Sequence, residues 1–128
     1  MKHLVLSIPN IKLPSINHKY IVARGRMILS RQYRDLKEFL SNEVSRLHID
    51  PPYRVLIVIE TSCDIDNNLK VILDSLTGNC IDDDRDIEEL IIKKKKIKRN
   101  KSGSLKVYVE TITIEDTFKE ILKLLGFK

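Results

Sequence analysis

The stretch YRVLIVIETSCDIDNNLKVILDSLTG, residues 53–78, contains the two patterns on which the predicted fold is centred. Residues 53–61 form an almost unbroken apolar run, which is typical of a central β-strand. Leucines and isoleucines then recur at helical spacing as far as Leu76, and Gly78 is a typical C-terminal stop. The stretch therefore predicts a buried strand followed by a helix over about 67–77.

The segments before this stretch predict three further elements. The alternating sequence HLVLSIP predicts a strand over about 3–9, and a long loop with a short strand near Met27–Leu29 follows it. Ser30 is a suitable N-cap for a helix that the prolines of the segment 50–52 would end. The apolar stripe of this helix consists of Tyr33, Leu36, Leu40, Val44 and Leu47.

The segments after this stretch predict a hairpin and a final helix. Residues 86–98 and 104–114 have the composition of strands, and the turn RNKSG at 99–103 would join them as neighbours. The sequence EDTFKEILKLLG predicts an amphipathic helix with an inward face. That face consists of Phe118, Ile121, Leu122 and Leu125. The order of elements predicts one α/β (α+β) domain over 1–128, with a mixed β-sheet and helices.

Composition restricts the class of protein. Apolar residues make up 42% and charged residues 32% of the 128 residues, which describes an ordinary folded domain. No apolar run approaches the roughly 20 residues that span a bilayer, and the N-terminus lacks a signal-peptide pattern. Cys63 and Cys80 have no zinc-site spacing, so we expect them to be reduced thiols. Together these features predict a cytoplasmic protein that is not bound to a membrane. The net charge of +5 permits a polyanionic partner.

Acidic residues cluster around the predicted helix. Asp64 and Asp66 are two residues apart after the strand, so their carboxylates point the same way if strand geometry continues. Lys70 and Asp74 follow Asp66 at helical intervals, which would put these three on one polar stripe. A single aspartate at such a position is more often a helix cap than a ligand. Clustered like charges are nevertheless costly, and a divalent cation is their usual remedy.

The loop after the helix adds the sequence DDD at 82–84. If it folds back over the strand end, Asp83 or Asp84 would join Asp64, and three hard oxygen ligands suit Mg²⁺ or Mn²⁺. An EF-hand is excluded because Leu69 occupies the glycine position and Ser75 the bidentate glutamate position. A haloacid-dehalogenase-type phosphatase is disfavoured because the sequence DIDNN lacks the expected threonine.

These residues resemble the core motif of the RusA family of Holliday junction resolvases, which reads approximately D-x-D-N-x-x-K, D-A-L-x-G and D-D. The matching positions are Asp64, Asp66, Asn67, Lys70, Asp74, Leu76, Gly78, Asp83 and Asp84. The segments IPNIKLPSINHKY and ARGRMILSRQYRD are similar to the N-terminal pattern of the family. The resemblance covers about residues 5–112.

The resemblance implies a metal-dependent endodeoxyribonuclease that acts on four-way junction DNA by paired symmetric nicks and leaves 5′-phosphate ends. Asp64, Asp66 and Asp84 would bind Mg²⁺, with Mn²⁺ as a substitute, and Asp83 is the alternative third ligand. Lys70 would be the essential cation beside them. Two symmetric nicks favour a homodimer with two sites.

Basic residues are candidates for DNA contacts. The segment KKKKIKRNK, residues 93–101, predicts a phosphate-binding strand, although lysines also protect exposed sheet edges from aggregation. The candidates are Lys93, Lys95 and Lys98 here, with Lys19, Tyr20, Arg24 and Arg26 in the N-terminal loop.

The alternatives to a junction-resolving nuclease are a non-catalytic DNA-binding protein and a broader flap or fork nuclease. The composition, rich in Ile and Lys, hints at a virus or phage source.

Overall fold

The computed structural model describes residues 2–13, 20–23, 26–29 and 31–126, with the backbone alone for 20–23, 26–29 and 66–67. Its elements follow one another along the chain in an α+β order. They are β1 (His3–Ile11), β2 (Tyr20–Ala23), β3 (Arg26–Leu29), α1 (Arg31–Glu43), β4 (Tyr53–Thr61), α2 (Asp66–Leu76), the short 3₁₀ turn η1 (Asp84–Asp86), β5 (Ile87–Lys96), β6 (Gly103–Thr111) and α3 (Ile114–Leu124).

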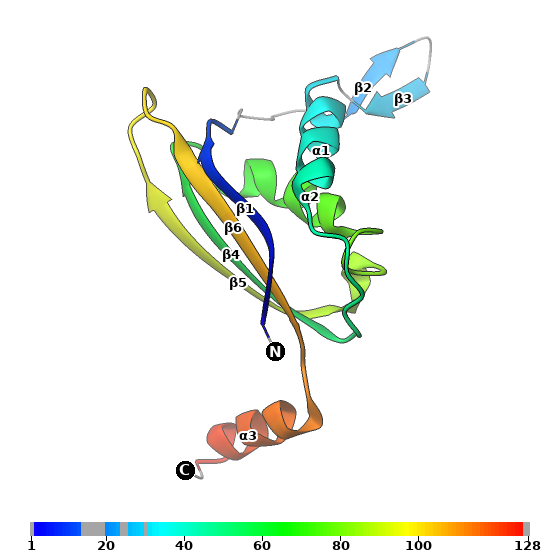
Figure 1. Ribbon diagram of the computed structural model, residues 1–128, viewed down its shortest axis with the longest axis vertical. Coiled ribbons are helices and arrows are strands. Elements are labelled where there is room, and N and C mark those ends of the chain that lie inside the picture. The colour runs from blue at the N-terminus through cyan, green and yellow to red at the C-terminus, as the bar shows by residue number, and fades with distance from the viewer. Residues whose placement is uncertain (1, 14–19, 24–25, 30, 127–128) are drawn as a thin grey trace.

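Four strands form a mixed sheet in the order β1-β6-β4-β5, which confirms the predicted fold class (Figure 1). β4 pairs in parallel with β5 and antiparallel with β6, so it lies at the centre. β2 and β3 form a separate two-stranded antiparallel ribbon. No helix within the described ranges has both the length and the apolar character needed to cross a membrane.

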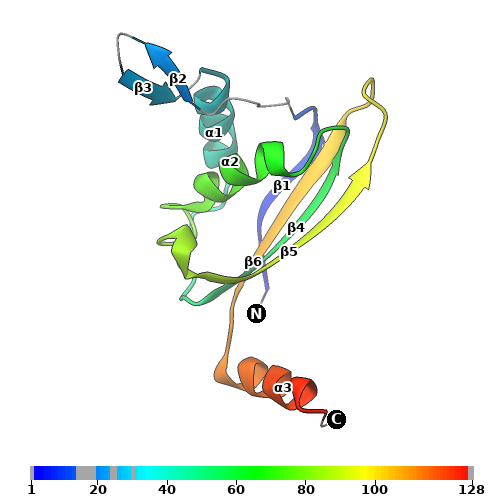
Figure 2. The ribbon, with the colours of Figure 1, turned by 180° about the vertical axis from the view of Figure 1, so that it is seen from behind.

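One face of the sheet is covered by α1 and α2 (Figure 2). Along β4 every second side chain is buried, and Val55, Ile57 and Ile59 on that face have no solvent exposure. They pack with the buried side chains of both helices, of which Leu40 and Ile72 are completely enclosed. We call the opposite face of the sheet the open face, because neither α1 nor α2 covers it.

The predicted hairpin between the two C-terminal strands is wrong. β5 and β6 do not pair with each other, because β4 lies between them and pairs with both. The segment 97–102 therefore passes around the end of β4, where the Ile97 amide donates to the Thr61 carbonyl at 3.2 Å. Gly103 is required at this crossing, since a Cβ atom there would lie 1.7 Å from the Glu60 carbonyl oxygen. The apolar strand β4 pairs on both sides, because it has buried positions along its whole length and is most stable at the centre of the sheet.

The boundaries of α2 are close to those predicted, whereas α1 ends earlier than expected. α2 begins one residue earlier than expected, and Gly78 has the positive φ of +84° that ends such a helix. α1 stops at Glu43, well before the prolines, because the Ser45 amide leaves the helix and donates to the Val5 carbonyl at 2.8 Å. The proposed cap Ser30 lies outside the described residues.

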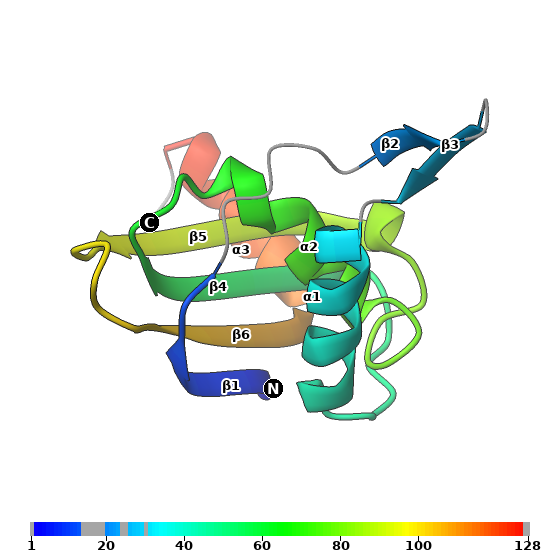
Figure 3. The same cartoon turned by 90° about the horizontal axis from the view of Figure 1, so that it is seen from above.

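The prediction that α3 turns its apolar face inward is wrong. Phe118 is 60% exposed, Ile121 49% and Leu125 67%, and only Leu122 is half-buried. The chain runs on past the end of β6 through Ile112, so α3 stands apart from α1 and α2, on the side of the open face (Figures 1 and 3). A capping box between Thr113 and Asp116 fixes where α3 begins.

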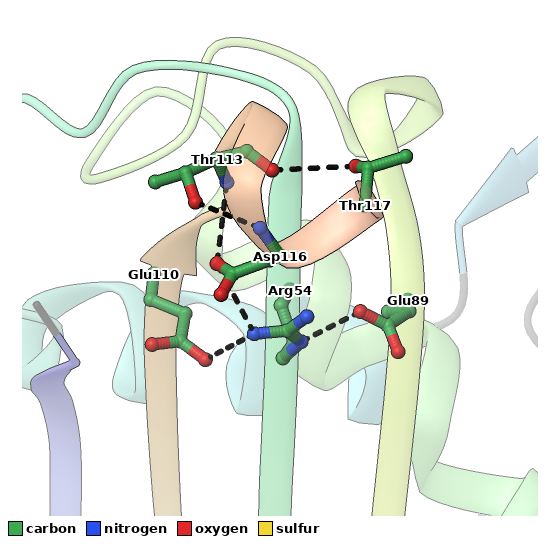
Figure 4. Close-up of polar contacts among 6 residues, drawn as sticks. All are labelled: Arg54, Glu89, Glu110, Thr113, Asp116 and Thr117. Atoms are coloured by element: carbon green, nitrogen blue, oxygen red, sulfur yellow. Dashed lines mark hydrogen bonds and ion pairs between the residues drawn. The ribbon is translucent and has the colours of Figure 1, made fainter. Parts of the chain in front are cut away.

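Arg54 connects the open face to the start of α3 (Figure 4). Its Nε donates to Glu89 Oε2 at 2.6 Å and its Nη1 to Glu110 Oε1 at 2.9 Å, on the strands at either side. The same Nη1 lies 4.0 Å from Asp116 Oδ2 in the first turn of α3. The hydrogen bonds to Glu110 and then to Glu89 raise the pKa of Arg54. One cation on β4 therefore contacts residues of three other elements.

Replacing Arg54 by Met should lower the free energy of unfolding by about 1–3 kcal/mol, because it leaves two part-buried carboxylates facing each other without a cation. Thermal or denaturant unfolding followed by circular dichroism measures the change. The matched control is Arg31→Met, whose ion pair with Asp35 is 89% and 68% exposed at its two side chains. That control should cost about 0.5 kcal/mol or less. Equal losses in the two variants would contradict the bridging role of Arg54.

Candidate catalytic site

The first acidic residues follow the end of the central strand. β4 ends at Thr61 and α2 begins at Asp66, so Asp64 lies in the turn between them, where it is exposed. Strand geometry does not continue to Asp64, because the strand stops three residues before it, so the condition for aligning Asp64 with Asp66 by strand alternation is not met. Asp66 occupies the first position of α2, and its side chain is outside the description.

Lys70 connects two acidic residues that come from different elements. Its Nζ lies 3.0 Å from Asp84 Oδ2 in η1 and 3.2 Å from Asp74 Oδ1 one helical turn further along α2. The side chain of Lys70 is 54% exposed, whereas those of Asp84 and Asp74 are 33% and 19% exposed. The hydrogen bond to Asp84, and then that to Asp74, raises the pKa of Lys70. Lys70 is therefore a cation at neutral pH that already faces carboxylates.

A buried tyrosine supports this arrangement from below. Tyr33 on α1 is 3% exposed, and its hydroxyl donates to Asp74 Oδ2. The hydrogen-bond chain thus runs from the core through Asp74 to Lys70 and Asp84. The sequence suggested Tyr33 as part of the apolar stripe of α1, which is correct for its ring. Its polar role had one signal only, its place in the N-terminal pattern shared with the RusA family.

The structure separates the two alternative third acids, Asp83 and Asp84. Asp83 faces its own turn: its Oδ1 accepts from the Arg85 amide at 3.0 Å, and its Oδ2 lies 3.4 Å from Arg85 Nε. The hydrogen bond from the Arg85 amide is the main cause that lowers the pKa of Asp83. Asp84, in contrast, reaches Lys70 on α2. Of the two acids, Asp84 is therefore the one that joins the residues of the helix.

The acidic loop is fixed to the base of the central strand. The Asp82 amide donates to the hydroxyl of Tyr53 at 3.2 Å. Tyr53 is the first residue of β4 and has no solvent exposure, and burial raises its pKa. The following residues, Asp83 and Asp84, thereby begin from a defined point. Tyr53 thus helps to position the acidic residues 82–84, although it is not part of the sequence motif.

The donor types fit a hard divalent cation, because carboxylate oxygens are the ligands that Mg²⁺ and Mn²⁺ prefer. Among the side chains that the structure describes, no three His, Cys, Asp or Glu residues lie close enough to hold one ion. The predicted set of Asp64, Asp66 and Asp84 fits such a cation in its chemistry, because all three residues are carboxylates. The side chain of Asp66 is not among those that the structure describes. Within the described set, Lys70 compensates the charge of Asp84.

Another polar group near this site is buried without compensation. Asn68 in the first turn of α2 has no solvent exposure, and neither its amide nitrogen nor its amide oxygen has a hydrogen-bond partner. Such a group costs about 1–3 kcal/mol. It faces the core, as Val71 and Ile72 do, rather than the polar stripe that carries Lys70. We assign it no role in binding a metal.

The lysine run of β5 is divided between the two faces of the sheet. Lys93 and Lys95 pair with β4 residues of the open face, away from α2. Lys94 pairs with the buried Ile59, so Lys94 and Lys96 lie on the side of the helices and of the acidic residues. All four lysines are exposed. Strand alternation requires such a division, and only the pairing with β4 shows which half faces the site.

A hollow lies where the central strand ends, next to the turn that carries Asp64. It is lined by Ser62, Lys96, Ile97, Lys98 and Arg99. The three cations Lys96, Lys98 and Arg99 therefore lie beside the turn in which the acidic segment begins. Of the N-terminal candidates, Lys19 and Arg24 lie outside the described residues. Tyr20 and Arg26 begin the backbones of β2 and β3, and their side chains are not described.

Comparison with known families gives a match over most of the chain. The family model described as endodeoxyribonuclease RusA matches residues 11–110 of the 128 residues. The matched region contains α1, α2, η1 and the lysine run, and it excludes α3. A search of curated proteins found no similar sequence.

Replacing Tyr53 by Phe should release the Asp82 amide and lower the free energy of unfolding by about 0.5–1.5 kcal/mol. Amide hydrogen exchange should accelerate at Asp82 more than in the β4 core. The matched control is Tyr108→Phe, which removes a hydroxyl from the open face. Unchanged exchange at Asp82 in the Tyr53 variant would show that this hydrogen bond does not hold the acidic loop.

Proposed function

Since the chain belongs to the RusA family of endodeoxyribonucleases, we propose that it resolves Holliday junctions by paired symmetric nicks, with Mg²⁺ as the cofactor. The observation that carries the proposal is the contact of Lys70 with Asp84. It joins two residues of the family motif across the space between α2 and η1. The family accounts for the class of reaction, and the metal and the products are parts of the proposal.

We assign the metal ligands to Asp64, Asp66 and Asp84, with Mn²⁺ as a substitute for Mg²⁺. When bound, the cation would neutralise phosphate charge and lower the pKa of a water molecule. The chain would contribute hard oxygen donors from three segments, the turn after β4, the first residue of α2 and η1. Until the cation binds, Lys70 compensates the charge of Asp84, which keeps the acidic site from opening by repulsion.

Lys70 is proposed to stabilise the negative charge that develops on the phosphate or on the leaving oxygen. Its pKa is raised by the hydrogen bonds to Asp84 and then to Asp74, so it keeps its proton throughout the neutral range. Asp74 and Tyr33 are positioning residues, because they act through Lys70. Cleavage that leaves the 3′ oxygen as leaving group gives 5′-phosphate and 3′-hydroxyl ends.

DNA binding is proposed to use the cations near the site, since phosphate contacts position the substrate. Lys94, Lys96, Lys98 and Arg99 lie on the side of the acidic residues or line the hollow beside them. Lys93 and Lys95 stay candidates from the sequence, although their face of the sheet is the other one. The N-terminal candidates are Lys19, Tyr20, Arg24 and Arg26.

Two symmetric nicks require two active sites, so we propose a homodimer with a two-fold axis. A four-way junction has matching symmetry, and a dimer presents one site to each of two strands. The dimer is a separate part of the proposal, because a monomer with the same site would still nick DNA.

The first test is cleavage of a synthetic four-way junction in the presence of Mg²⁺ or of EDTA. Wild type should make paired symmetric nicks on the junction in Mg²⁺, and EDTA should abolish them. Asp66→Asn should lower the rate by at least about 100-fold, the scale of a single electrostatic contributor, while junction binding is retained or improved. The rate is measured on end-labelled strands in denaturing gels.

Matched substrates decide between the alternatives. A linear duplex of the same sequence should stay intact, and equal cleavage of flaps or forks would support a broader nuclease. Tight junction binding with no cleavage in Mg²⁺ or Mn²⁺ would support a non-catalytic DNA-binding protein. Metal binding has an independent readout: Mg²⁺ should raise the melting temperature of wild type more than that of Asp84→Asn.

Replacing Tyr33 by Phe should lower the turnover rate about tenfold with little change in junction affinity, because Asp74 loses a hydrogen bond that orients Lys70. Asp84 and then Asp74 raise the pKa of Lys70, and Asp74 is no longer held in place in this variant. The pKa of Lys70 should therefore fall, and the alkaline limb of the rate profile should move to lower pH. A purely structural role would lower stability and leave that limb in place. The profile therefore distinguishes positioning from packing.

The two faces of β5 provide a matched pair of variants. Lys94→Ser with Lys96→Ser should weaken junction binding and lower the slope of log affinity against log salt by about 1–2. Lys93→Ser with Lys95→Ser removes the same charge from the open face and should have the smaller effect. Titration at several salt concentrations measures both. The reverse order would place the DNA on the open face.

A further inference from the structure

We infer that the hollow at the end of β4 binds one particular phosphate of the DNA, the immediate neighbour of the phosphate that is cut. This hollow is lined by Ser62, Lys96, Ile97, Lys98 and Arg99. The inference rests on the proposed nuclease function and adds to it a site for a named ligand, the non-bridging oxygens of a single phosphodiester. Its test measures binding without metal, so that its failure is distinguishable from a failure to cleave.

The lining of the hollow has the composition of an anion site. The hollow has a volume of about 430 Å³, and its lining offers three cations and the hydroxyl of Ser62 but no carboxylate. Lys96, Lys98 and Arg99 are all exposed. None of these three makes an ion pair with the residues that the structure describes, whereas Lys70 is paired with Asp84. Their charges are therefore free to meet an anion from outside the chain.

The basic surface continues from the hollow toward β1, which indicates the class of anion. The adjoining surface is lined by Lys12 and Lys101 together with Ser62 and Ile97, and it also contains no carboxylate. Lys12 follows the end of β1, whereas Lys101 lies in the segment 97–102 between β5 and β6. Cations from separate parts of the chain thus follow one another along one end of the sheet. Such a row matches a chain of phosphates, as in a DNA backbone, better than a single small anion.

A buried residue, Thr61, fixes the hollow against the acidic turn. Its carbonyl accepts a hydrogen bond from the amide of Ile97, in the lining of the hollow, at 3.2 Å. Its Oγ1 accepts from the amide of Cys63, next to Asp64, at 3.1 Å. Thr61 is 4% exposed and ends β4, so both contacts start from the rigid central strand. The cationic lining and the acidic turn are therefore held at one spacing before DNA binds.

The cationic segment between β5 and β6 is itself closed into a turn. The amide of Lys101 donates to the carbonyl of Lys98 at 3.0 Å, which is the hydrogen bond of a β-turn. Figure 3 shows this segment passing around the end of β4, at the point where the chain turns toward α2. A backbone that is already ordered loses less entropy when its side chains bind a ligand. The segment is thus prepared to hold a phosphate at a defined place.

The short path between the hollow and the acidic turn selects the phosphate. Ser62 and Asp64 are two residues apart, so their Cα atoms are separated by at most about 7 Å. This length is comparable to one nucleotide step along a DNA strand. When the scissile phosphate lies at the acidic residues, a neighbour in the same strand lies at the hollow. Binding of that neighbour positions the strand, and the acidic residues act on the next phosphate.

Junctions that carry a single uncharged methylphosphonate test the inference. Nicks made in Mg²⁺ locate the scissile phosphate, and binding of each modified junction is then titrated in EDTA. For wild type, a methylphosphonate at one of the two neighbours of the scissile phosphate should weaken binding about tenfold, the scale of one charged hydrogen-bond contact. In Lys98→Ser with Arg99→Ser, the unmodified junction should bind more weakly, and the same methylphosphonate should cause no further loss.

The matched control is Lys119→Ser with Lys123→Ser on α3, which follows the strand end paired with the start of β4. It removes the same charge far from the hollow and should keep the tenfold sensitivity. Wild type that is insensitive at both neighbours, or a Lys98 and Arg99 variant that keeps the full loss, would overturn the inference while cleavage stands. Binding with the predicted coupling at one phosphate, but without any nick, would instead refute the nuclease and retain the hollow as a DNA site.

A covalent tether provides a second measurement that does not depend on the charge variants. In a Cys63→Ser background, Lys98→Cys is mixed with a junction that carries a short thiol-reactive group on the sensitive phosphate. The remaining thiol, Cys80, is 3% exposed and should not react. A covalent adduct should form with Lys98→Cys and not with Lys123→Cys. Equal yields from the two variants, or no adduct with Lys98→Cys, would overturn the inference.

Discussion

The structure depends on the central position of β4, which pairs with β5 on one side and β6 on the other. A strand with apolar residues on both faces is most stable where both of its ladders are filled and one face meets helices. This position draws the chain past the end of β4 in the segment 97–102 and requires glycine at position 103. It also delivers the turn with Asp64 and the start of α2 to one end of the sheet.

The candidate site uses the rigid parts of this frame to hold charges that repel one another. Asp74 is held from the core by Tyr33, and the loop before Asp84 is fixed by the hydroxyl of Tyr53. Lys70 lies between the carboxylates of Asp74 and Asp84, and the hydrogen bonds to Asp84 and then to Asp74 raise its pKa. The charges of these described residues are therefore partly compensated within the chain itself.

The cations are distributed in a way that a net charge of +5 does not reveal. Lysines of the same strand alternate between the helix side and the open face, so half of the run is on the side of the acidic residues and half is on the open face. A single lysine-rich segment thereby contributes cations to both faces of the sheet, because a strand alternates its side chains.

Local pattern in the sequence determined the central strand, the helix that follows it and its end at Gly78, since these depend on periodicity and on the conformational freedom of glycine. The family resemblance also implied that Lys70 lies beside Asp64, Asp66 and Asp84, and the structure shows its contact with Asp84. Strand neighbours were not determined locally: RNKSG resembles a hairpin turn, and only the tertiary structure inserts β4 between β5 and β6. The amphipathic pattern of α3 predicted that this helix has an apolar face. Only the tertiary structure decided that this face does not turn inward, because the contacts of Asp116 with Arg54 and of Ile112 with Pro52 hold the start of α3 away from α1 and α2.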